Sequence, residues 1–395
     1  MNKLSIDQVD LKGKRVFIRV DFNVPLENGE VSDDTRIRKA IPTIKYAVDQ
    51  GARVIVASHL GRPQGEPKPE YSLRPVASVF GGLLGEPVSF AEDCVGDTAK
   101  SAVEALSGGD VLLLENLRFH KQEKENDDDF ARDLASLADV YVNDAFGTAH
   151  RAHASTEGIT RFVDTCAAGF LMKSEIDYFN KSMTHPKRPL AAIVGGAKVS
   201  TKLQALDHLV DKCDIMLIGG GMTFTFLKYI GLEIGDNILE EDMVREAGEI
   251  MAKAKSKGVR FYLPVDFVIA DTIDDDAPVD HVTFQELPKG KIAPDIGPAT
   301  IELFKLAIKN AKTIIWNGPT GVFEKKPFAG GTMAMVEALA ESDALTVVGG
   351  GDSVKAVNMA KAADKIDFVS TGGGAFLELM EGKTLPGLAA LDDVG

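Results

Sequence analysis

Residues 190–198 read LAAIVGGAK, a run of five apolar residues that ends in two glycines and a lysine. Short apolar runs that close on glycine or on polar residues recur along the whole chain. Because these runs are nearly continuous rather than alternating in polarity, they predict strands buried on both faces of a parallel sheet. The ten predicted strands are 15–20, 52–57, 111–114, 140–142, 190–194, 215–218, 260–263, 313–316, 345–348 and 368–370.

Segments of helical periodicity lie between these runs. Ile37, Ile41, Ile44 and Val48 fall on one helical face, and Gly51 follows as a helix-ending residue. Strands that alternate with helices predict βαβ units and an α/β fold. Ten strands are too many for one small sheet, so we expect two sheets, with a connecting helix over 170–179 and a boundary in the polar segment 181–189.

Composition narrows the class of protein. The 395 residues are 45% hydrophobic and 26% charged, and the net charge of -15 disfavours nucleic acid as a partner. Cys94, Cys166 and Cys213 are widely spaced and show neither a disulfide framework nor a zinc-binding spacing, so we interpret them as buried apolar residues. The chain has no signal sequence and no apolar run of membrane length, so we expect a cytoplasmic protein without a membrane partner.

Arginine and histidine follow the predicted strands of the first half. Ligands of open parallel sheets bind beyond the carboxyl ends of the strands, and arginine carries a fork of donors that suits phosphate or carboxylate. We expect Arg36, Arg62, Arg118 and Arg151, together with His59, to form a cationic pocket for a small, multiply charged anion. Each of them alone could be an ordinary surface residue; only their shared placement favours the pocket.

Glycine runs follow the predicted strands of the second half, at 195–196, 219–221, 349–351 and 372–374. Glycine loops that lead into helices present backbone N–H groups to nucleotide phosphates, although any one run could also be a plain tight turn. An anion pocket on one sheet and nucleotide loops on another predict phosphoryl transfer across a cleft.

Two other classes of protein remain as alternatives. A nicotinamide-dependent dehydrogenase would use a similar doubly wound sheet, but the chain has no G-x-G-x-x-G segment. A two-domain solute-binding protein could close around an anion, but it would normally carry an export signal. The P-loop and protein-kinase motifs are also missing.

The motifs at the strand ends resemble those of the phosphoglycerate kinase family. The resemblance extends in family order from about residue 3 to about residue 391. One segment departs from the family pattern, since KIAPD at 291–295 stands where the family often has a glycine. The matching segments are RVDFNVP at 19–25, SHLGRP at 58–63, ENLRF at 115–119, AHRAH at 149–153, GGAKV at 195–199, WNGP at 316–319, VFE at 322–324, GGGDS at 349–353, STGGG at 370–374 and KTLPG at 383–387.

The resemblance implies reversible, Mg²⁺-dependent phosphoryl transfer between 1,3-bisphosphoglycerate and ADP, which gives 3-phosphoglycerate and ATP in glycolysis and gluconeogenesis. It implies a monomer of two doubly wound, Rossmann-like domains joined by a helix and hinge, with a cleft between them that closes on the ligands. The 3-phosphoglycerate domain would span 1–170 plus a C-terminal tail at about 378–395, the connecting segment 171–189, and the nucleotide domain 190–377.

The resemblance also assigns roles to residues. Arg36, Lys198, Gly372 and Gly373 would meet the transferring phosphoryl group, and Asp352 would hold the magnesium ion. The 3-phosphoglycerate ligands would be Asp21, Asn23, Arg36, His59, Arg62, Arg118 and Arg151, and the nucleotide ligands Lys202, Ala293, Asn317, Glu324, Gly350, Gly351, Asp352 and Ser353.

Overall fold

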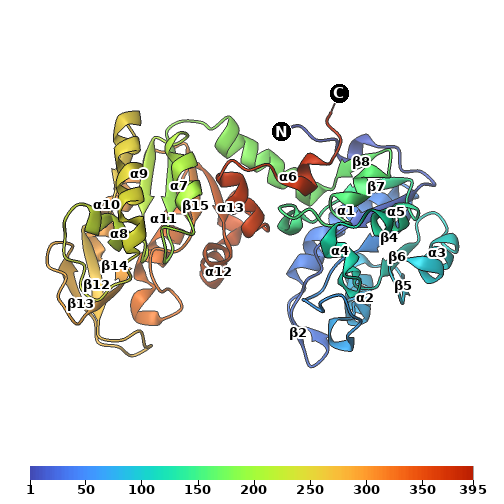
Figure 1. Ribbon diagram of the computed structural model, residues 1–395, viewed down its shortest axis with the longest axis horizontal. Coiled ribbons are helices and arrows are strands. Elements are labelled where there is room, and N and C mark those ends of the chain that lie inside the picture. The colour runs from blue at the N-terminus through green and yellow to red at the C-terminus, as the bar shows by residue number, and fades with distance from the viewer. Residues whose placement is uncertain (395) are drawn as a thin grey trace. The chain divides into compact units, whose positions relative to one another are not determined.

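The structure is a computed structural model that describes residues 1–394 (Figure 1). The chain forms two compact units. Unit 1 contains Met1–Asp177 together with the residues from Thr384 onward, and unit 2 contains Tyr178–Lys383. Unit 2 is therefore an insertion into unit 1, and the chain passes between the units twice.

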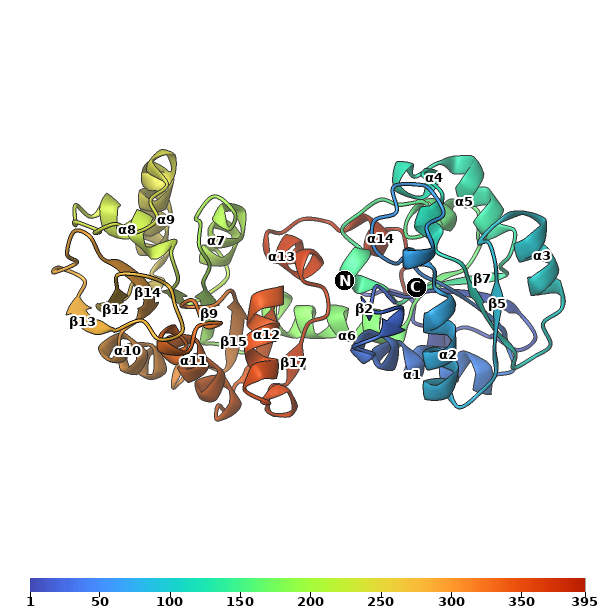
Figure 2. The same cartoon turned by 90° about the horizontal axis from the view of Figure 1, so that it is seen from below.

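Unit 1 is built on a six-stranded parallel sheet in the order β5-β6-β4-β1-β7-β8. Helices α1 and α2 cover one face of the sheet and α4 and α5 the other (Figure 2). Valine and isoleucine of β1 and β4 are fully buried between these layers, as nearly continuous apolar strands require. The elements are β1 (Arg15–Arg19), α1 (Thr35–Asp49), β4 (Arg53–Ala57), α2 (Arg74–Leu84), β5 (Val88–Ala91), α3 (Gly96–Glu104), β6 (Val111–Leu114), α4 (Gln122–Glu125), α5 (Asp128–Ala135), β7 (Val140–Asn143) and β8 (Cys166–Ala168).

Unit 2 has a second six-stranded parallel sheet, in the order β11-β10-β9-β15-β16-β17. Helices α7 and α9 lie on one face and α10 and α11 on the other (Figure 2). Trp316, the only tryptophan of the chain, is fully buried in its core. The elements are β9 (Leu190–Val194), α7 (Leu203–Val210), β10 (Ile215–Ile218), α8 (Thr223–Tyr229), α9 (Val244–Lys257), β11 (Arg260–Tyr262), α10 (Pro298–Ile308), β15 (Thr313–Asn317), α11 (Gly330–Ala340), β16 (Leu345–Gly349), α12 (Gly351–Met359), β17 (Phe368–Val369) and α13 (Gly374–Met380).

The α/β, doubly wound fold class is confirmed, and all ten predicted strands form with ends that shift by one residue at most. The two predicted parallel sheets form, and the described residues contain two further sheets that were not predicted. Strands β5 and β8 were missed because β5 is only partly buried and β8 is short and alanine-rich. The additional sheets are antiparallel: β13 (Asp280–Thr283), β12 (Asp266–Ala270) and β14 (Ile292–Ile296) in unit 2, and the pair β2 (Leu26–Glu27) and β3 (Glu30–Val31) in unit 1.

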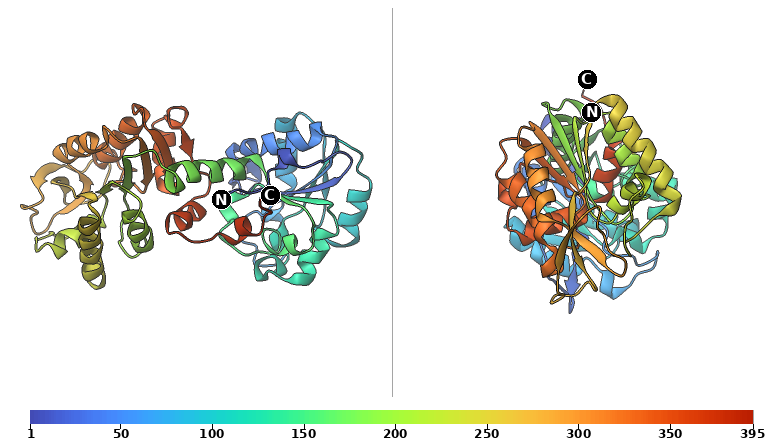
Figure 3. Two further views of the ribbon diagram at one scale, coloured as in Figure 1. Left: turned by 90° about the horizontal axis from the view of Figure 1, so that it is seen from above. Right: turned by 90° about the vertical axis from the view of Figure 1, so that its left-hand side faces the viewer.

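The predicted helix over 170–179 forms as α6 (Phe170–Phe179), and the two units divide inside it, after Asp177, and not in the polar segment 181–189. The C-terminal residues return to unit 1, where the two chain ends lie together (Figure 3). Leu4 donates its backbone N–H to the Asp392 carbonyl at 2.8 Å, and Lys3 pairs with Asp393 at 2.9 Å. Helix α14 (Pro386–Ala389) lies beyond β7, where the Asn143 side chain donates to the Gly387 carbonyl. No helix of residues 1–394 is both long enough and apolar enough to cross a membrane.

Candidate functional site

A cationic cavity of about 290 Å³ opens in unit 1. Its lining includes the predicted residues Arg62 and Arg118, which follow β4 and β6, and Arg151, which lies beyond β7. No carboxylate lines the cavity, and none of these three arginines forms a salt bridge within residues 1–394. A pocket with this charge and size suits a small anion with more than one negative group. The full lining is Arg62, Gln64, Arg118, Lys124, Arg151 and His153.

The remaining predicted residues of unit 1 form a hydrogen-bonded group after β1 and β4. Arg36 on α1 pairs with Asp21, with 2.5 Å between Nη1 and Oδ2, and His59 Nδ1 lies 3.8 Å from the other Asp21 oxygen. The Asn23 side chain accepts the Gly61 backbone N–H at 2.9 Å. Asp21 thus orients the exposed Arg36 side chain, which keeps further donors free for a ligand.

A buried network supports the cavity and was not found from the sequence. Arg19, at the end of β1, is fully buried and donates from Nε to Ser155 Oγ at 2.8 Å. Ser155 in turn donates to the buried Glu123 carboxylate at 2.6 Å, and Arg19 Nη2 lies 3.2 Å from His59 Nδ1. Arg19 and Glu123 occur within or near matching segments, but nothing in their spacing indicated a link through Ser155.

Burial and mutual repulsion set the ionisation of this region. Burial, then the charges of Arg19 and Arg151, lower the pKa of Arg118 to about 10. Burial and the nearby arginines also lower the pKa of His153 to about 3 and hold that of His59 well below its usual value. The Arg118 Nε atom is buried and has no hydrogen-bond partner. A bound anion would relieve both the repulsion and the unpaired donor.

A second cavity, also of about 290 Å³, lies in unit 2 beyond β9, β10 and β15. Its walls are mostly apolar and include Phe224, Ile238 and Val322, whereas carboxylates occur at Asp236, Glu324 and Asp352. Glycines at 196, 220 and 221 form part of the lining. Three predicted nucleotide ligands therefore line one cavity, namely Ala293, Glu324 and Asp352. An apolar wall with glycine loops and few polar groups is typical of a nucleotide pocket.

The loop after β16 leads into α12 at the edge of this cavity. Gly350 has a φ of +91°, and a Cβ atom on it would lie 3.0 Å from the Asn317 side-chain nitrogen. Gly351 has open space around it, so packing does not require glycine there, and the first turn of α12 leaves backbone N–H groups without helical partners. The Ser353 hydroxyl accepts the Gly318 backbone N–H at 2.6 Å. This contact fixes the loop after β15 against α12.

Lys202 and Asn317 are in contact with each other. Lys202 Nζ donates to the Asn317 side-chain oxygen, and Asn317 Nδ2 is buried without a hydrogen-bond partner. Burial lowers the pKa of Lys202, and the charge of Asp352 opposes that shift. The pair therefore offers one cationic donor and one unpaired amide donor next to the first turn of α12.

Several glycines of unit 2 serve packing between loops instead. A Cβ atom on Gly318 would lie 2.1 Å from the Gly195 carbonyl oxygen, and one on Gly220 would lie 2.6 Å from the Gly196 oxygen. Close packing between loops therefore accounts for glycine at position 220, which belongs to the run 219–221, and at position 318, which lies outside the four runs. Of the remaining predicted residues, Lys198 is exposed after β9, and Gly372 and Gly373 follow β17; none of the three lines the cationic cavity or the apolar one.

Asp352 has the properties of a ligand for a hard divalent cation. Its carboxylate is exposed at the edge of the unit 2 cavity and makes no salt bridge within the described part of the chain. Mg²⁺ prefers oxygen ligands and usually binds through one or two carboxylates together with waters and phosphate oxygens. The residues present therefore fit a magnesium ion that arrives with a nucleotide.

Comparisons of the chain with known proteins agree with one another. A family model described as phosphoglycerate kinase matches residues 6–383. A phosphoglycerate kinase of Geobacter metallireducens is 56% identical over 392 residues, which cover 99% of this chain and 98% of the relative. The solved phosphoglycerate kinase of Coxiella burnetii is 41% identical with a TM-score of 0.92, and that of Pyrococcus horikoshii is 31% identical with a TM-score of 0.81. Each alignment covers 98% of both chains.

Proposed function

The chain belongs to the phosphoglycerate kinase family, and from this premise we propose how its two sites carry out the reaction. The activity is phosphoryl transfer to a carboxyl group, from ATP to 3-phosphoglycerate, or in reverse from 1,3-bisphosphoglycerate to ADP. The assignment of 3-phosphoglycerate to unit 1 and of the nucleotide to unit 2 rests on one observation. Unit 1 holds a cavity lined by cations without a carboxylate, whereas unit 2 holds an apolar cavity with glycine loops.

In unit 1, the arginines of the cationic cavity bind 3-phosphoglycerate. Arg62, Arg118 and Arg151 have no carboxylate partner, so their donors are available to the phosphate group. The residues Asp21, Asn23, Arg36 and His59 bind the carboxylate and hydroxyl end. Both histidines, His59 and His153, stay neutral at physiological pH, because burial and the arginines lower their pKa values.

In unit 2, the adenine ring lies along the apolar wall near Ala293, and Glu324 lies at the ribose. The phosphates lie at the start of α12, where the backbone of Gly350, Gly351, Asp352 and Ser353 provides N–H donors. Lys202 and the unpaired amide of Asn317 reach the same phosphates. Mg²⁺ would be held by Asp352 and the nucleotide, and it would supply positive charge toward the β- and γ-phosphate oxygens.

The transfer step needs no general base. The acceptor is a carboxylate, which is already deprotonated at neutral pH. The attacking carboxylate oxygen forms a bond to the γ-phosphorus while the bond from that phosphorus to the β–γ bridging oxygen breaks, and ADP leaves. The protein therefore acts by position and charge. Arg36, Lys198 and the backbone N–H groups of Gly372 and Gly373 stabilise the charge on the transferring group.

The two ligands bind to different units, so transfer requires the units to approach each other and exclude water. We place the hinge in residues 170–189, with the second chain passage near residue 383 as its counterpart. We propose that the enzyme works as a cytoplasmic monomer without nucleic acid or membrane partners.

A coupled assay for ADP formation that depends on 3-phosphoglycerate tests the activity. Arg36→Ala and Lys198→Ala should each reduce kcat by at least about 100-fold, since each removes a charge that acts on the transition state. Circular dichroism should show an unchanged fold, because both side chains are exposed. Wild-type kcat in either variant would contradict the role of that residue, and ADP formation that ignores 3-phosphoglycerate would contradict the function.

A further inference from the structure

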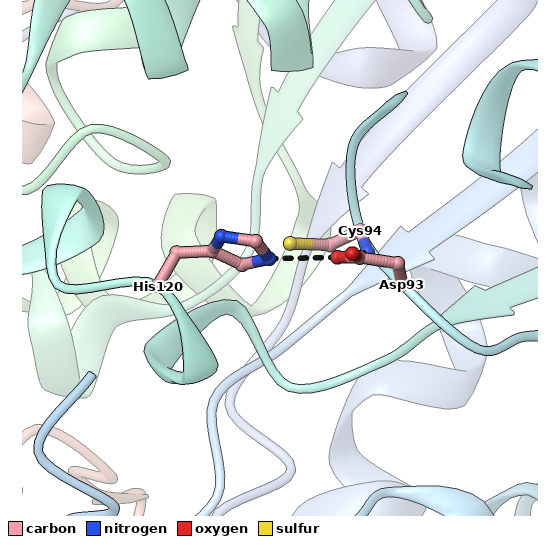
Figure 4. Close-up of side chains that lie close together, drawn as sticks. All are labelled: Asp93, Cys94 and His120. Atoms are coloured by element: carbon pink, nitrogen blue, oxygen red, sulfur yellow. Dashed lines mark hydrogen bonds and ion pairs between the residues drawn. The ribbon is translucent and has the colours of Figure 1, made fainter. Parts of the chain in front are cut away.

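A group of three potential metal ligands lies outside both cavities described above. Asp93 and Cys94 follow β5, and His120 follows β6, the neighbouring strand of the unit 1 sheet. Figure 4 shows the thiol, the carboxylate and the imidazole pointing toward one another from these two loops. One ligand atom from each residue lies within 4.8 Å of the others, and His120 Nε2 lies 2.7 Å from Asp93 Oδ1.

We propose that Asp93, Cys94 and His120 form a binding site for Zn²⁺ or a similar thiophilic divalent cation. A thiolate, an imidazole and a carboxylate are the ligand types that zinc prefers. Three atoms within 4.8 Å of one another leave a central point no more than about 2.8 Å from each of them, against roughly 2.0–2.3 Å for zinc–ligand bonds. Shifts of about 0.5–0.8 Å per ligand would therefore complete the coordination.

The surroundings provide an entry path and an open coordination position. Cys94 is 1% exposed, whereas the Asp93 and His120 side chains are 44% and 28% exposed. Asp93 and His120 both line a separate cavity of about 670 Å³. Glu92 and Glu115 line the same cavity, which also contains Lys68 and Arg74. A cation can therefore reach Asp93 and His120 from this cavity, with the Cys94 sulfur within 4.8 Å of their ligand atoms, and a water molecule can take the fourth position.

The proton and charge balance is simple. Binding forms a metal–sulfur bond, and the Cys94 thiol proton passes to the solvent. The proton on His120 Nε2, which now links it to Asp93, moves through the solvent to Nδ1, so the neutral imidazole binds the metal through Nε2. The thiolate and carboxylate together neutralise the two positive charges. A soft thiolate ligand also selects against Mg²⁺, which prefers oxygen ligands.

Cobalt provides a direct probe, because a Co²⁺–thiolate bond has a charge-transfer absorption that oxygen ligands do not produce. The full-length, metal-free protein is titrated with Co²⁺ in the absence of nucleotide and Mg²⁺. We expect one Co²⁺ per chain with the thiolate band, and loss of the band when Zn²⁺ is added. Cys94→Ser should abolish the band, and Asp93→Asn and His120→Gln should each weaken Co²⁺ binding by more than about tenfold.

Cys213→Ser is the matched control, because Cys213 is also buried but belongs to no such group in the described chain. This variant should keep the band. Circular dichroism checks folding; if Cys94→Ser does not fold, the variants of the two partly exposed ligands carry the test. Co²⁺ binding without a thiolate band, or a band that survives Cys94→Ser, would overturn the proposal. Unchanged affinity in both Asp93→Asn and His120→Gln would do the same.

Discussion

The buried charge of Arg118 destabilises the folded, ligand-free protein, and a bound anion should offset this destabilisation. Burial and the neighbouring Arg19 and Arg151 lower its pKa from 12.5 to about 10, which corresponds to about 3 kcal/mol against the charged form. Replacement by methionine keeps an apolar side chain of similar reach and removes this cost. The variant also loses the hydrogen bond from Arg118 to the Gly61 carbonyl, about 1.5 kcal/mol. We therefore expect Arg118→Met to stabilise ligand-free unit 1 by roughly 1–2 kcal/mol.

The same substitution should weaken 3-phosphoglycerate binding. Loss of charge-assisted hydrogen bonds worth about 1.5–3 kcal/mol lowers affinity by roughly 10- to 100-fold. The Arg118→Met variant should therefore be more stable than the wild type without ligand, and this difference should disappear or reverse when 3-phosphoglycerate is added. Without ligand, the variant melts above the wild type by about 2–6 °C, and at a ligand concentration near 100 times the wild-type Kd it melts no higher than the wild type.

Thermal unfolding followed by far-UV circular dichroism measures both effects, with and without 3-phosphoglycerate. Trp316 fluorescence reports on the unfolding of unit 2 alone. The midpoint of that transition should be the same in the variant and the wild type, so it serves as an internal reference. Arg161→Met is the matched control, because Arg161 is partly exposed and paired with Glu157 at 2.9 Å. It should be neutral or slightly destabilising and should leave ligand protection intact. A ligand-free Arg118→Met protein that is less stable than the wild type, with normal ligand protection, would refute the reasoning.

Two further predictions concern pH and the chain terminus. Burial raises the pKa of Asp295 from 3.8 to about 7, so the folded protein favours the protonated carboxyl. The contribution of this group to the free energy of unfolding is therefore complete below pH 3.8 and is lost as the pH rises through 7. Between pH 5 and pH 8, the wild type should therefore lose about 2–3 kcal/mol relative to Asp295→Asn, as measured by urea unfolding with Trp316 fluorescence; parallel pH profiles would exclude this role. Removal of the residues from Thr384 onward exposes core surface that Leu385, Leu388 and Leu391 cover, at a cost of about 5 kcal/mol to unit 1. In the truncated protein, unit 1 should unfold before unit 2, so the circular dichroism transition should separate from the transition seen by Trp316 fluorescence. Two transitions that still coincide at the wild-type midpoint would contradict this prediction.

The buried parallel strands were predictable because each carries its signal locally. A run such as 190–194 is apolar throughout, and each of the ten runs predicted to be strands lies in a six-stranded sheet. β13 (Asp280–Thr283) lacked this signal because it is largely exposed and polar. β12 does contain an apolar run, FVIA at 267–270, but this run was not predicted to be a strand. The antiparallel sheet of unit 2 was therefore not found, although its strand β14 contributes Ala293 to the apolar cavity.

The candidate site was predictable where one residue at a strand end indicates its own chemistry, as with Arg62 and Arg118. It was not predictable where function depends on pairs distant in sequence. Lys124 lines the cationic cavity from α4, and Glu123 beside it anchors Ser155, but neither follows a strand. The group at Asp93, Cys94 and His120 was missed for the same reason, because neighbouring strands bring together residues that are far apart in the chain.

The insertion of unit 2 into unit 1 has a consequence for synthesis of the protein on the ribosome. Translation delivers the first 177 residues of unit 1 early, but the segment from Thr384 onward emerges only at the end. Leu4 cannot form its hydrogen bond until Asp392 has been synthesised, and Asn143 cannot form its own until Gly387 has been synthesised. Unit 1 therefore completes its hydrogen bonds only after all of unit 2 has been translated. Unit 2 is contiguous and can fold during translation. Unit 2, to which we assign the nucleotide, should thus be the first to reach its final structure, although most of unit 1 precedes it in the sequence.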